Sequence, residues 1–284
     1  MSTAAAGIPR ENAPPLGPSS AGLDGRVAVV TGAARGIGAA TAVALARFGA
    51  DVAIRDRDVA GMERTADEVR AAGRRVLVRE TDVRDGAGVE HFLTDSRDAL
   101  GPPDTLVNNA GGGFWAPFQD VTAKGQGALV DENFTSATHV VRHGVPLMND
   151  GGSIVNGTTV EAFRAAPGFA VYAAMKAAVE QLTRSLALEL SQRRIRVNCV
   201  APDAIPTPGD AGLGATVPHD GGEDYEAYAA KVPLGFGTTD DCAAAIVFLA
   251  SDMSRFITGT TLHVDGGSPA ASGWTRRANG TFML

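Results

Sequence analysis

The chain has 284 residues, of which 44% are hydrophobic, so it can build one large α/β domain or two ordinary ones. Its net charge of −7 excludes a broadly basic surface for nucleic acid or an anionic membrane. No stretch approaches the roughly 20 apolar residues of a membrane-spanning helix. The two cysteines, Cys199 and Cys242, are too few for a disulfide framework, and we expect a reduced, cytoplasmic protein.

The N-terminal segment, residues 1–24, is rich in alanine, proline, glycine and serine and lacks the features of a targeting signal, so we expect a disordered tail. From residue 26 onward, short apolar runs alternate with longer helical patterns. The apolar runs predict strands at residues 26–31, 51–55, 75–80, 104–109, 152–157, 195–201 and 260–266. The patterns between them predict helices at residues 36–49, 60–73, 86–100, 124–149 and 171–190.

Strands that alternate with helices predict βαβ units and a parallel sheet covered by helices on both faces. No linker-like sequence interrupts residues 25–268, so we expect one domain. Residues 203–236 break the alternation, because they are rich in glycine and proline and follow the end of a strand. Loops at that edge of an open α/β sheet face the ligand crevice. We expect a substrate-covering lid with a short helix at about residues 224–231, a mobile surface loop being the alternative.

Three glycines, Gly32, Gly36 and Gly38, lie between the first strand and the first helix in the sequence VVTGAARGIG. Glycine allows the backbone to turn tightly and to approach a pyrophosphate at the helix N-terminus. The strand-turn-helix context therefore predicts a dinucleotide site. The alternative is a turn that only packs the helix against the strand.

Further motifs follow at set separations: NNAG at residues 108–111, Tyr172-x-x-x-Lys176, and VNCVAP at residues 197–202. With these motifs the chain resembles the classical short-chain dehydrogenases/reductases over about residues 24–268. The resemblance implies a Rossmann-type, doubly wound domain with a seven-stranded parallel sheet flanked by helices on both faces. It also implies NAD(H) or NADP(H) as cofactor. The extended relatives of the family have a different glycine spacing and longer chains.

The choice of dinucleotide depends on Asp56, which stands at the tip of the second strand. A carboxylate there can accept the ribose 2′-hydroxyl of NAD and repels the 2′-phosphate of NADP. Arg35 and Arg57 favour the opposite choice, because arginines can hold a 2′-phosphate. We favour NAD and retain NADP as the alternative.

The resemblance implies further cofactor contacts. Asp82 matches the residue that contacts adenine, a helix cap being its alternative role. Thr207 matches the hydroxyl that holds the nicotinamide amide. The remaining positions that the family pattern places at the cofactor are Ile37, Val83, Asn109, Ala110, Gly111, Pro202 and Ile205. After Pro202 the family usually has glycine, whereas this chain has Asp203, so we expect an unusual nicotinamide pocket.

Tyr172 and Lys176 are four residues apart in a convincing helix and therefore share one helix face. A free tyrosine has a pKa near 10, and a nearby ammonium lowers it by favouring the phenolate. Tyr172 can then exchange a proton with the substrate oxygen as hydride is transferred. The resemblance implies that Lys176 also holds the nicotinamide ribose. Asn133 matches a helix asparagine that supports a water relay from Lys176, a local helix kink being the alternative.

The family has a serine thirteen residues before the tyrosine, and Thr159 occupies that position here. Threonine keeps a hydroxyl that can hydrogen-bond the substrate oxygen, but it adds a methyl group. The neighbouring Thr158 is a second candidate for this role. Alternatively, both threonines only suit the end of a strand.

The histidines His139 and His143 are four apart, but no third ligand is near them in the sequence, so we predict no metal site. Aromatic residues follow the motif strands and can line an apolar substrate pocket, or belong to the core or an interface. These residues are Phe114, Trp115, Phe118, Phe163 and Phe169.

We predict an NAD(H)-dependent oxidoreductase that interconverts a small-molecule secondary alcohol and a ketone. The resemblance implies a homotetramer, with contacts through residues 124–149, 171–190 and the C-terminal tail, residues 269–284. One alternative is an NADPH-dependent 3-oxoacyl-carrier-protein reductase. The other is a dinucleotide-binding sensor or scaffold without turnover, which only Thr159 and Asp203 support.

Overall fold

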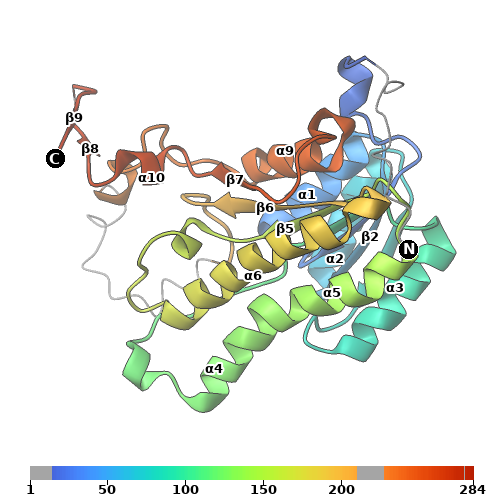
Figure 1. Cartoon of the computed structure of the whole chain (residues 1–284), viewed down its shortest axis with the longest axis horizontal. Helices are drawn as coiled ribbons and strands as arrows, with labels where there is room; N and C mark the ends of the chain where they lie inside the picture. The colour runs from blue at the N-terminus through green and yellow to red at the C-terminus, as the bar shows by residue number, and fades with distance from the viewer. Residues whose placement is uncertain (1–14, 210–226, 278) are drawn as a thin grey trace, which may run out of the picture.

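A computed structural model of the chain describes residues 15–209, 227–277 and 279–284. Seven strands form one sheet in the order β3-β2-β1-β4-β5-β6-β7, and every neighbouring pair is parallel. The predicted fold class is therefore confirmed (Figure 1). The strands are β1 (Val27–Thr31), β2 (Asp51–Asp56), β3 (Val76–Glu80), β4 (Thr105–Asn108), β5 (Ser153–Gly157), β6 (Arg196–Pro202) and β7 (Thr261–Val264).

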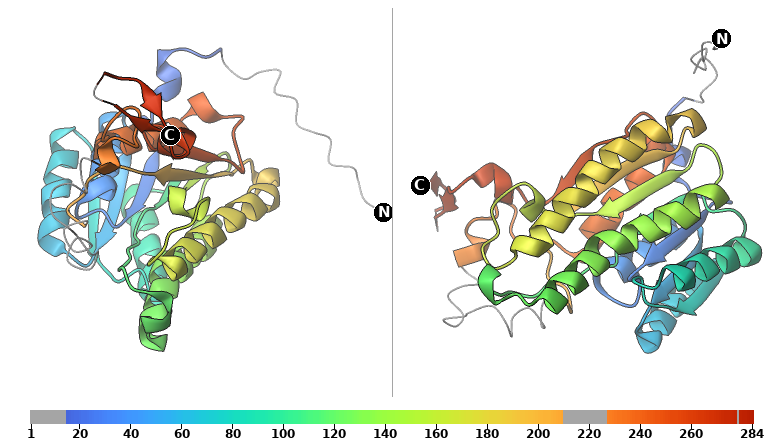
Figure 2. Two further views of the ribbon diagram at one scale, coloured as in Figure 1. Left: turned by 90° about the vertical axis from the view of Figure 1, so that its left-hand side faces the viewer. Right: turned by 60° about the horizontal axis from the view of Figure 1, so that its bottom comes forward.

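Helices cover both faces of the sheet, because the central strands are apolar on both sides. All five residues of β1 are buried. The core beneath one face includes α1 (Gly36–Arg47), α2 (Val59–Ala71) and α9 (Thr239–Ala250). The core beneath the other includes α3 (Gly86–Leu100), α5 (Ser136–Gly144) and α6 (Ala170–Glu189). The right-hand view of Figure 2 shows α3, α5 and α6 side by side over this second face.

The direction of winding reverses at β1. The chain proceeds from β1 outward through β2 to β3, and then β4 pairs with the other edge of β1. In a sheet of this kind the loops diverge beyond the carboxyl ends of the two strands that flank the reversal, and a ligand crevice opens there. The fold thus places the candidate site beyond the ends of β1 and β4.

The helix predicted at residues 124–149 is interrupted. It begins as α4 (Ala123–Val130), continues as a π-helical turn over Asp131–Thr135 and resumes as α5. A single π-turn carries an extra residue within the helix and is found frequently at functional sites. Here it contains the buried Asn133. The alternative interpretation of Asn133 as the site of a local helix irregularity therefore describes its backbone correctly.

Helix α9 is absent from the sequence-based assignment. Its start nevertheless carries a recognisable signal, because Thr238 and Asp241 form a capping box in which the Thr238 amide donates to the Asp241 carboxylate at 2.7 Å. Within the predicted lid, residues 227–229 are helical, whereas residues 210–226 lie outside the described residues. The short helix predicted at residues 224–231 is therefore described only in part.

Part of the predicted N-terminal tail is folded. Residues 1–14 lie outside the described residues, but Pro18–Ala21 form a 3-10 turn and Leu23 is buried in the core. At the other end, α10 (Ser268–Ala271) leads to a hairpin of β8 (Thr275–Arg276) and β9 (Phe282–Met283), which projects from the body of the molecule (Figure 1). In the part of the chain that the structure describes, no helix combines the length and the apolar character needed to cross a bilayer.

Candidate active site

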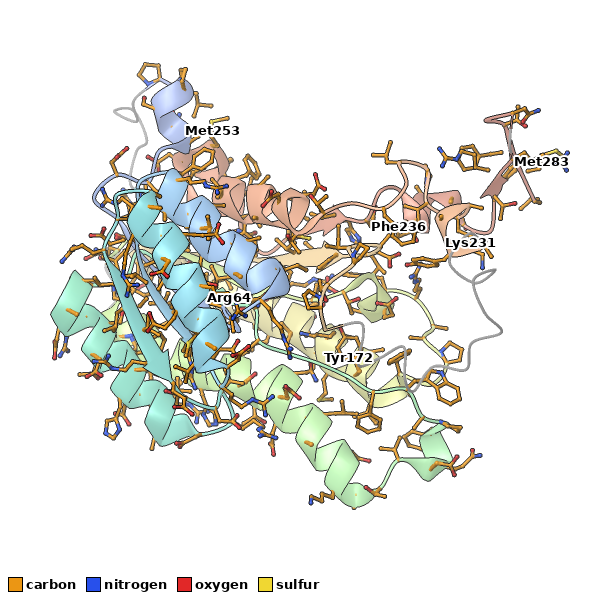
Figure 3. The ribbon with its side chains drawn as sticks, turned by 180° about the vertical axis from the view of Figure 1, so that it is seen from behind. Arg64, Tyr172, Lys231, Phe236, Met253 and Met283 are labelled. Atoms are coloured by element: carbon orange, nitrogen blue, oxygen red, sulfur yellow. The ribbon has the colours of Figure 1, made fainter. Side chains whose placement is uncertain are left out.

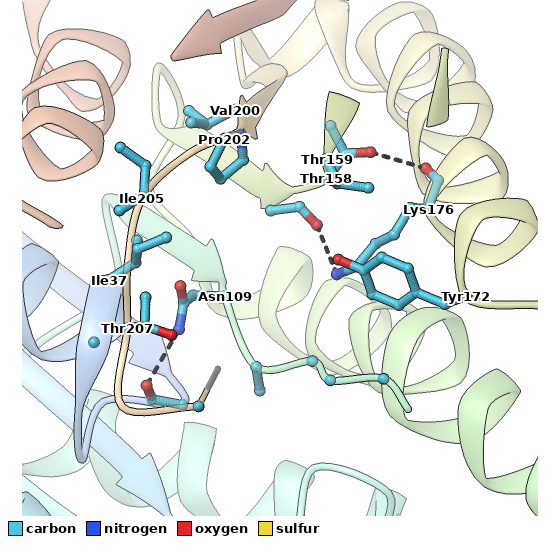
Figure 4. A pocket seen from close by; sticks show the side chains of 18 of the residues that line it. Ile37, Asn109, Thr158, Thr159, Tyr172, Lys176, Val200, Pro202, Ile205 and Thr207 are labelled. Atoms are coloured by element: carbon cyan, nitrogen blue, oxygen red, sulfur yellow. Dashed lines mark hydrogen bonds between the residues drawn. The ribbon is translucent and has the colours of Figure 1, made fainter. Parts of the chain in front are cut away.

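A pocket of about 990 Å³ opens beyond the carboxyl ends of the central strands, at the upper end of the size range of small-molecule sites. Figure 4 shows Thr158, Thr159, Tyr172 and Lys176 on one side of it and residues of the β1 and β6 loops on the other. Most of the predicted site residues line it: Gly32, Arg35, Gly36, Ile37, Asp56, Val83, Asn109, Ala110, Gly111, Thr159, Tyr172, Lys176, Pro202, Ile205 and Thr207. The three predicted residues that are not among the lining residues are Gly38, Asp82 and Asn133.

The glycine-rich turn after β1 leaves no room for a side chain at Gly32 or Gly38. A Cβ atom on Gly38 would lie 2.0 Å from the carbonyl oxygen of Gly32, so α1 approaches the turn closely. Gly32 has a φ of +67°, and a Cβ there would lie 2.9 Å from the Cα of Ala110. The N-cap of α1, Arg35, makes no side-chain capping bond. Amides at the start of α1 are therefore available to a phosphate, as a dinucleotide site requires.

Asp56 lies at the rim of this cradle. Its carboxylate accepts hydrogen bonds from the main-chain amides of Ala34 at 3.1 Å, Arg57 at 2.7 Å and Asp58 at 3.1 Å. These bonds hold the carboxylate beside the glycine turn, where a ribose hydroxyl of a bound dinucleotide would lie. The exposed side chain of Arg57 turns toward the carboxylate of Asp82, at 3.9 Å, and toward the carboxylate of Glu132 between α4 and α5.

Asp82 stands at the edge of the pocket. The side chain of Arg84 donates to its carboxylate and holds the pKa of Asp82 at about 2, well below the ordinary value. The residue that caps α3 is Asp85, whose carboxylate accepts from the amide of Ala87 at 3.1 Å. The helix-cap alternative for Asp82 is therefore wrong.

Lys176 is almost fully buried beneath the pocket. Its Nζ donates to the carbonyl of Gly157 at 3.1 Å and lies 5.7 Å from the centroid of the Tyr172 ring. Burial lowers the pKa of Lys176 to about 8, although the nearby Cys199 and Glu132 favour the charged form. A cation held this close to Tyr172 favours the phenolate over the phenol.

The two threonines have different partners. The hydroxyl of Thr158 donates to the main-chain carbonyl of Lys176 at 3.0 Å. The hydroxyl of Thr159 donates to the carboxylate of Glu161 and accepts from the Glu161 amide at 3.4 Å. Both threonines line the pocket, but Thr158 has an evident structural role in joining β5 to α6.

Asn133 reaches the loop after β4 from the π-helical turn. Its amide nitrogen donates to the carbonyls of Gly112 at 2.8 Å and Leu129 at 3.0 Å, and its oxygen accepts from the Gly112 amide at 3.2 Å. A Cβ on Gly111 would lie 2.9 Å from both the Asn133 oxygen and the Lys176 Nζ. Asn133 thus positions the loop that lies against Lys176.

A polar cluster that sequence analysis missed lies in the pocket beside Thr159. Arg164 donates to Glu161 at 3.0 Å and to Asp203 at 3.1 Å, and the hydroxyl of Tyr228 also donates to Asp203. The available signal was the i, i+3 spacing of Glu161 and Arg164 directly after Thr159. Asp203 uses its carboxylate in this cluster, and the unusual positive φ, +53°, belongs to the next residue, Ala204.

Of the five aromatic residues proposed for the pocket, Phe169 lines it. Phe118 and Phe163 are exposed, and Phe163 packs against the ring of His263. The described segments on either side of residues 210–226 both contribute to the pocket, through Thr207 on one side and Lys231 on the other. Figure 3 shows Lys231 on the same side of the molecule as Tyr172 and away from Met253.

Comparisons with known proteins agree with this architecture. The family model described as enoyl-(acyl carrier protein) reductase matches residues 32–268. A cyclohexanol dehydrogenase of Rhodococcus sp. (strain TK6) is 37% identical over 266 residues, which cover 86% of this chain and 96% of the relative.

Two solved structures carry different nicotinamide cofactors. Carveol dehydrogenase from Mycobacterium avium in complex with NAD has 32% identity and a TM-score of 0.81, over 87% of this chain and 99% of that one. A blue fluorescent protein from a metagenomic library in complex with NADPH has 35% identity and a TM-score of 0.78, over 87% and 98% of the two chains. Because the family model matches residues 32–268 and the cyclohexanol dehydrogenase is 37% identical over 86% of this chain, the chain belongs to the classical short-chain dehydrogenase/reductase family of NAD(P)-binding oxidoreductases.

Proposed function

We propose that the protein interconverts a secondary alcohol and a ketone, with NAD(H) as cofactor and Tyr172 and Lys176 as the acid-base pair. The observation that carries this proposal is the position of the buried Lys176, whose ammonium lies 5.7 Å from the Tyr172 ring at the end of the dinucleotide-sized pocket. The names of relatives such as cyclohexanol dehydrogenase and carveol dehydrogenase support an alcohol as substrate.

The chain's own residues supply proton transfer and orientation. In alcohol oxidation, the Tyr172 phenolate takes the hydroxyl proton, and the Lys176 ammonium stabilises the phenolate before that transfer. Thr159 hydrogen-bonds the substrate oxygen where charge develops. A bound nicotinamide would accept the hydride from the carbon that bears this oxygen. Asn133 and Thr158 keep Lys176 and the neighbouring loop in place through their main-chain hydrogen bonds.

Several contacts would hold the cofactor. The amides at the start of α1 suit the pyrophosphate, and the carboxylate of Asp56 suits an unphosphorylated ribose. Arg57 is already directed toward the carboxylate of Asp82. This pairing weakens the argument that Arg57 holds the 2′-phosphate of NADP. Arg35 is exposed at the rim, however, and one similar structure holds NADPH. An NADPH-dependent carrier-protein reductase is therefore the second candidate, which the description of the matching family model also supports.

We also propose a homotetramer. Family members commonly form oligomers, and two of the segments expected at the contacts expose apolar side chains in the single chain. Leu188 of α6 is 77% exposed, and Leu284 at the end of the projecting hairpin is 84% exposed. Burial of such side chains between subunits would remove apolar surface from water.

The test is a screen of secondary alcohols with NAD⁺ and NADP⁺, and of ketones with the reduced cofactors, followed by nicotinamide absorbance. The matched control is Tyr172→Phe, which keeps the ring and deletes the hydroxyl. We expect turnover to fall by about 10² or more, within the usual worth of a general acid-base group, while NADH affinity stays within a few-fold. Turnover that survives in Tyr172→Phe contradicts the assigned role. Cofactor binding without turnover of any compound supports the sensor or scaffold alternative.

A further inference from the structure

Glu161 is a carboxylate beside the proposed catalytic hydroxyl, and the mechanism above does not use it. It lies on the 3-10 turn Val160–Ala162 that follows β5, and its carboxylate folds back to accept the proton of the Thr159 hydroxyl. The side chain is 25% exposed and lines the same pocket as Tyr172. A substrate oxygen bound at Thr159 would therefore have Glu161 within reach.

In this arrangement the Thr159 hydroxyl has no proton left to donate to a substrate oxygen. A hydroxyl has one proton, and Thr159 gives that proton to Glu161. To donate to a reacting oxygen, the Thr159 hydroxyl must turn away from Glu161. One carboxylate oxygen of Glu161 then loses its donor inside the pocket, and an unpaired, partly buried charge is costly. The cost disappears if the substrate itself supplies a replacement donor.

Glu161 cannot readily swing out to recover a donor from solvent. Its other carboxylate oxygen is held by Arg164 at 3.0 Å. Arg164 is in turn held by Asp203 at 3.1 Å and by the hydroxyl of Ser268 at 3.1 Å. These anchors come from three separate parts of the chain, so the carboxylate is preorganised beside Thr159. Arg164 pairs with Glu161 as well as with Asp203, so Glu161 repels charge that develops on the reacting oxygen less than an unpaired carboxylate would.

We propose that Glu161 is a specificity-determining residue that binds a second hydroxyl of the substrate, on the carbon next to the reacting carbon. The substrate class is then a vicinal diol, or its α-hydroxy ketone in the reverse direction. The arrangement fits, because the two oxygens of a gauche vicinal diol lie side by side, as do the Thr159 hydroxyl and the Glu161 carboxylate that accepts its hydrogen bond. This inference rests on the proposed function. A hydroxyl suffices as donor, because the other oxygen of Glu161 already has a cationic partner in Arg164.

The chemistry balances without any further reactant. A bound oxidised nicotinamide would accept the hydride from the C–H bond that breaks, and the proton of the hydroxyl on that carbon passes to Tyr172. The product is the hydroxy ketone. The second hydroxyl keeps its proton throughout and donates it to Glu161, while Thr159 donates to the reacting oxygen.

The turnover test compares cis- and trans-1,2-cyclohexanediol with 2-methoxycyclohexanol and cyclohexanol. The methyl ether keeps the second oxygen and removes only its donor. Sites built to bind a substrate hydroxyl reject analogues without it by up to about 10⁴–10⁵. For the better diol isomer we expect a kcat/KM at least about 10²-fold above that of either analogue. Glu161→Leu should reduce the ratio of kcat/KM for the diol to kcat/KM for either analogue to about tenfold or less. Glu161→Gln keeps a carbonyl acceptor and should retain part of the preference for the diol.

Glu63→Gln, on the exposed side of α2, is the matched control and should behave like the wild type. Wild-type enzyme that oxidises cyclohexanol as well as the diols overturns the inference and leaves the proposed function intact. The same is true if Glu161→Leu folds, by circular dichroism, and keeps the full preference for diols.

A binding test does not depend on hydride transfer. We would titrate 2-hydroxycyclohexanone and cyclohexanone into Tyr172→Phe loaded with NADH, and follow nicotinamide fluorescence. We expect at least tenfold tighter binding of the hydroxy ketone, and loss of this difference when Glu161→Leu is added. If this selectivity is present but wild-type enzyme oxidises no alcohol, the proposed function fails, and the hydroxyl-binding role of Glu161 is retained. Equal binding of the two ketones overturns the inference.

Discussion

The hydroxyl of Thr158 lies 3.0 Å from the main-chain carbonyl of Lys176, to which it donates, whereas the hydroxyl of the adjacent Thr159 is directed to Glu161. Successive strand residues point to opposite sides, so the end of β5 presents one threonine to α6 and the other to the polar cluster. Thr158 therefore has a packing role, whereas the role that we propose for Thr159 is to hydrogen-bond the substrate.

Replacement of each threonine by valine tests this separation, because valine keeps the shape and deletes the hydroxyl. Thr159→Val should lower kcat by about 10²–10³, the usual cost of losing one oxyanion donor. Thr158→Val should keep kcat within about tenfold and lower the free energy of unfolding by about 1 kcal/mol, since the Lys176 carbonyl loses its donor. Single-turnover kinetics and urea denaturation measure the two effects.

Thr159→Ser is the control for this pair, because it restores the hydroxyl and removes only a methyl group. It should keep activity within about tenfold of the wild type and extend it to bulkier ketones. A larger kinetic loss in Thr158→Val than in Thr159→Val would exchange the two roles. If neither valine variant slows hydride transfer, both threonines are structural.

Asp56 should determine the choice of cofactor. We expect a kcat/KM for NAD⁺ at least about tenfold above that for NADP⁺, which corresponds to about 1.4 kcal/mol. Asp56→Asn removes the charge but keeps one oxygen, which can still accept from the amides of Arg57 and Asp58. Its preference for NAD⁺ should shrink by about tenfold, mainly through better use of NADP⁺.

Asp67→Asn, on the exposed side of α2, serves as a control for charge alone and should not change the cofactor ratio. Equal use of both cofactors by the wild-type protein, or a preference for NADP⁺, would assign the dominant role to Arg35 and Arg57.

The burial of Lys176 should appear in the pH dependence of stability. Its pKa is about 8 in the folded protein and ordinarily 10.5, so between these values the unfolded chain holds a proton that the folded chain has lost. Stability then rises with pH, and the cost of burying the ammonium, fully present below pH 8, is relieved as the pH approaches 10.5. Compared with Lys176→Met, the wild type should gain about 2 kcal/mol between pH 7 and pH 9.5, since one pKa unit corresponds to about 1.36 kcal/mol.

Urea denaturation of the two cofactor-free proteins at both pH values gives this difference directly, because the titrations of other groups cancel in the comparison. A difference between the proteins that does not change with pH would mean that Lys176 titrates as an exposed lysine does.

Arg164 should matter for stability as well as for substrate. The Asp203 side chain is only 7% exposed, and Arg164 is its ion-pair partner. Removal of one partner from such a pair leaves an uncompensated charge. Because Arg164 itself is 37% exposed and water can enter, we expect Arg164→Met to cost about 2 kcal/mol rather than the full value for a buried pair.

Addition of Asp203→Asn to Arg164→Met should restore a large part of this loss, because it removes the charge that was left unpaired. Thermal and urea denaturation of the wild type, the two single variants and the double variant give a complete double-mutant cycle. Additive losses would show that Arg164 and Asp203 do not interact in solution.

Local sequence patterns were sufficient for most of the fold. The strand and helix periods, together with the glycine turn containing Gly32 and Gly38, depend on neighbours in the chain, and the structure confirms the parallel sheet that they predict. The patterns did not predict the π-helical turn around Asn133, and they were not used to assign α9. The π-turn around Asn133 is stabilised by hydrogen bonds to the distant Gly112, which no periodicity reveals. Helix α9 was overlooked although Thr238 and Asp241 marked its start.

For the candidate site, the sequence by itself determined that Tyr172 and Lys176 share one helix face, because they are separated by about one helical turn. It also placed Asp56 at the end of a strand. Only the tertiary structure decided the partners of Thr158, Thr159 and Asp203. The bond from Arg164 to Asp203 joins residues 39 positions apart and exists because the loops after β5 and β6 meet at one edge of the sheet. Such contacts depend on how strands pair and helices pack, and no local spacing encodes them.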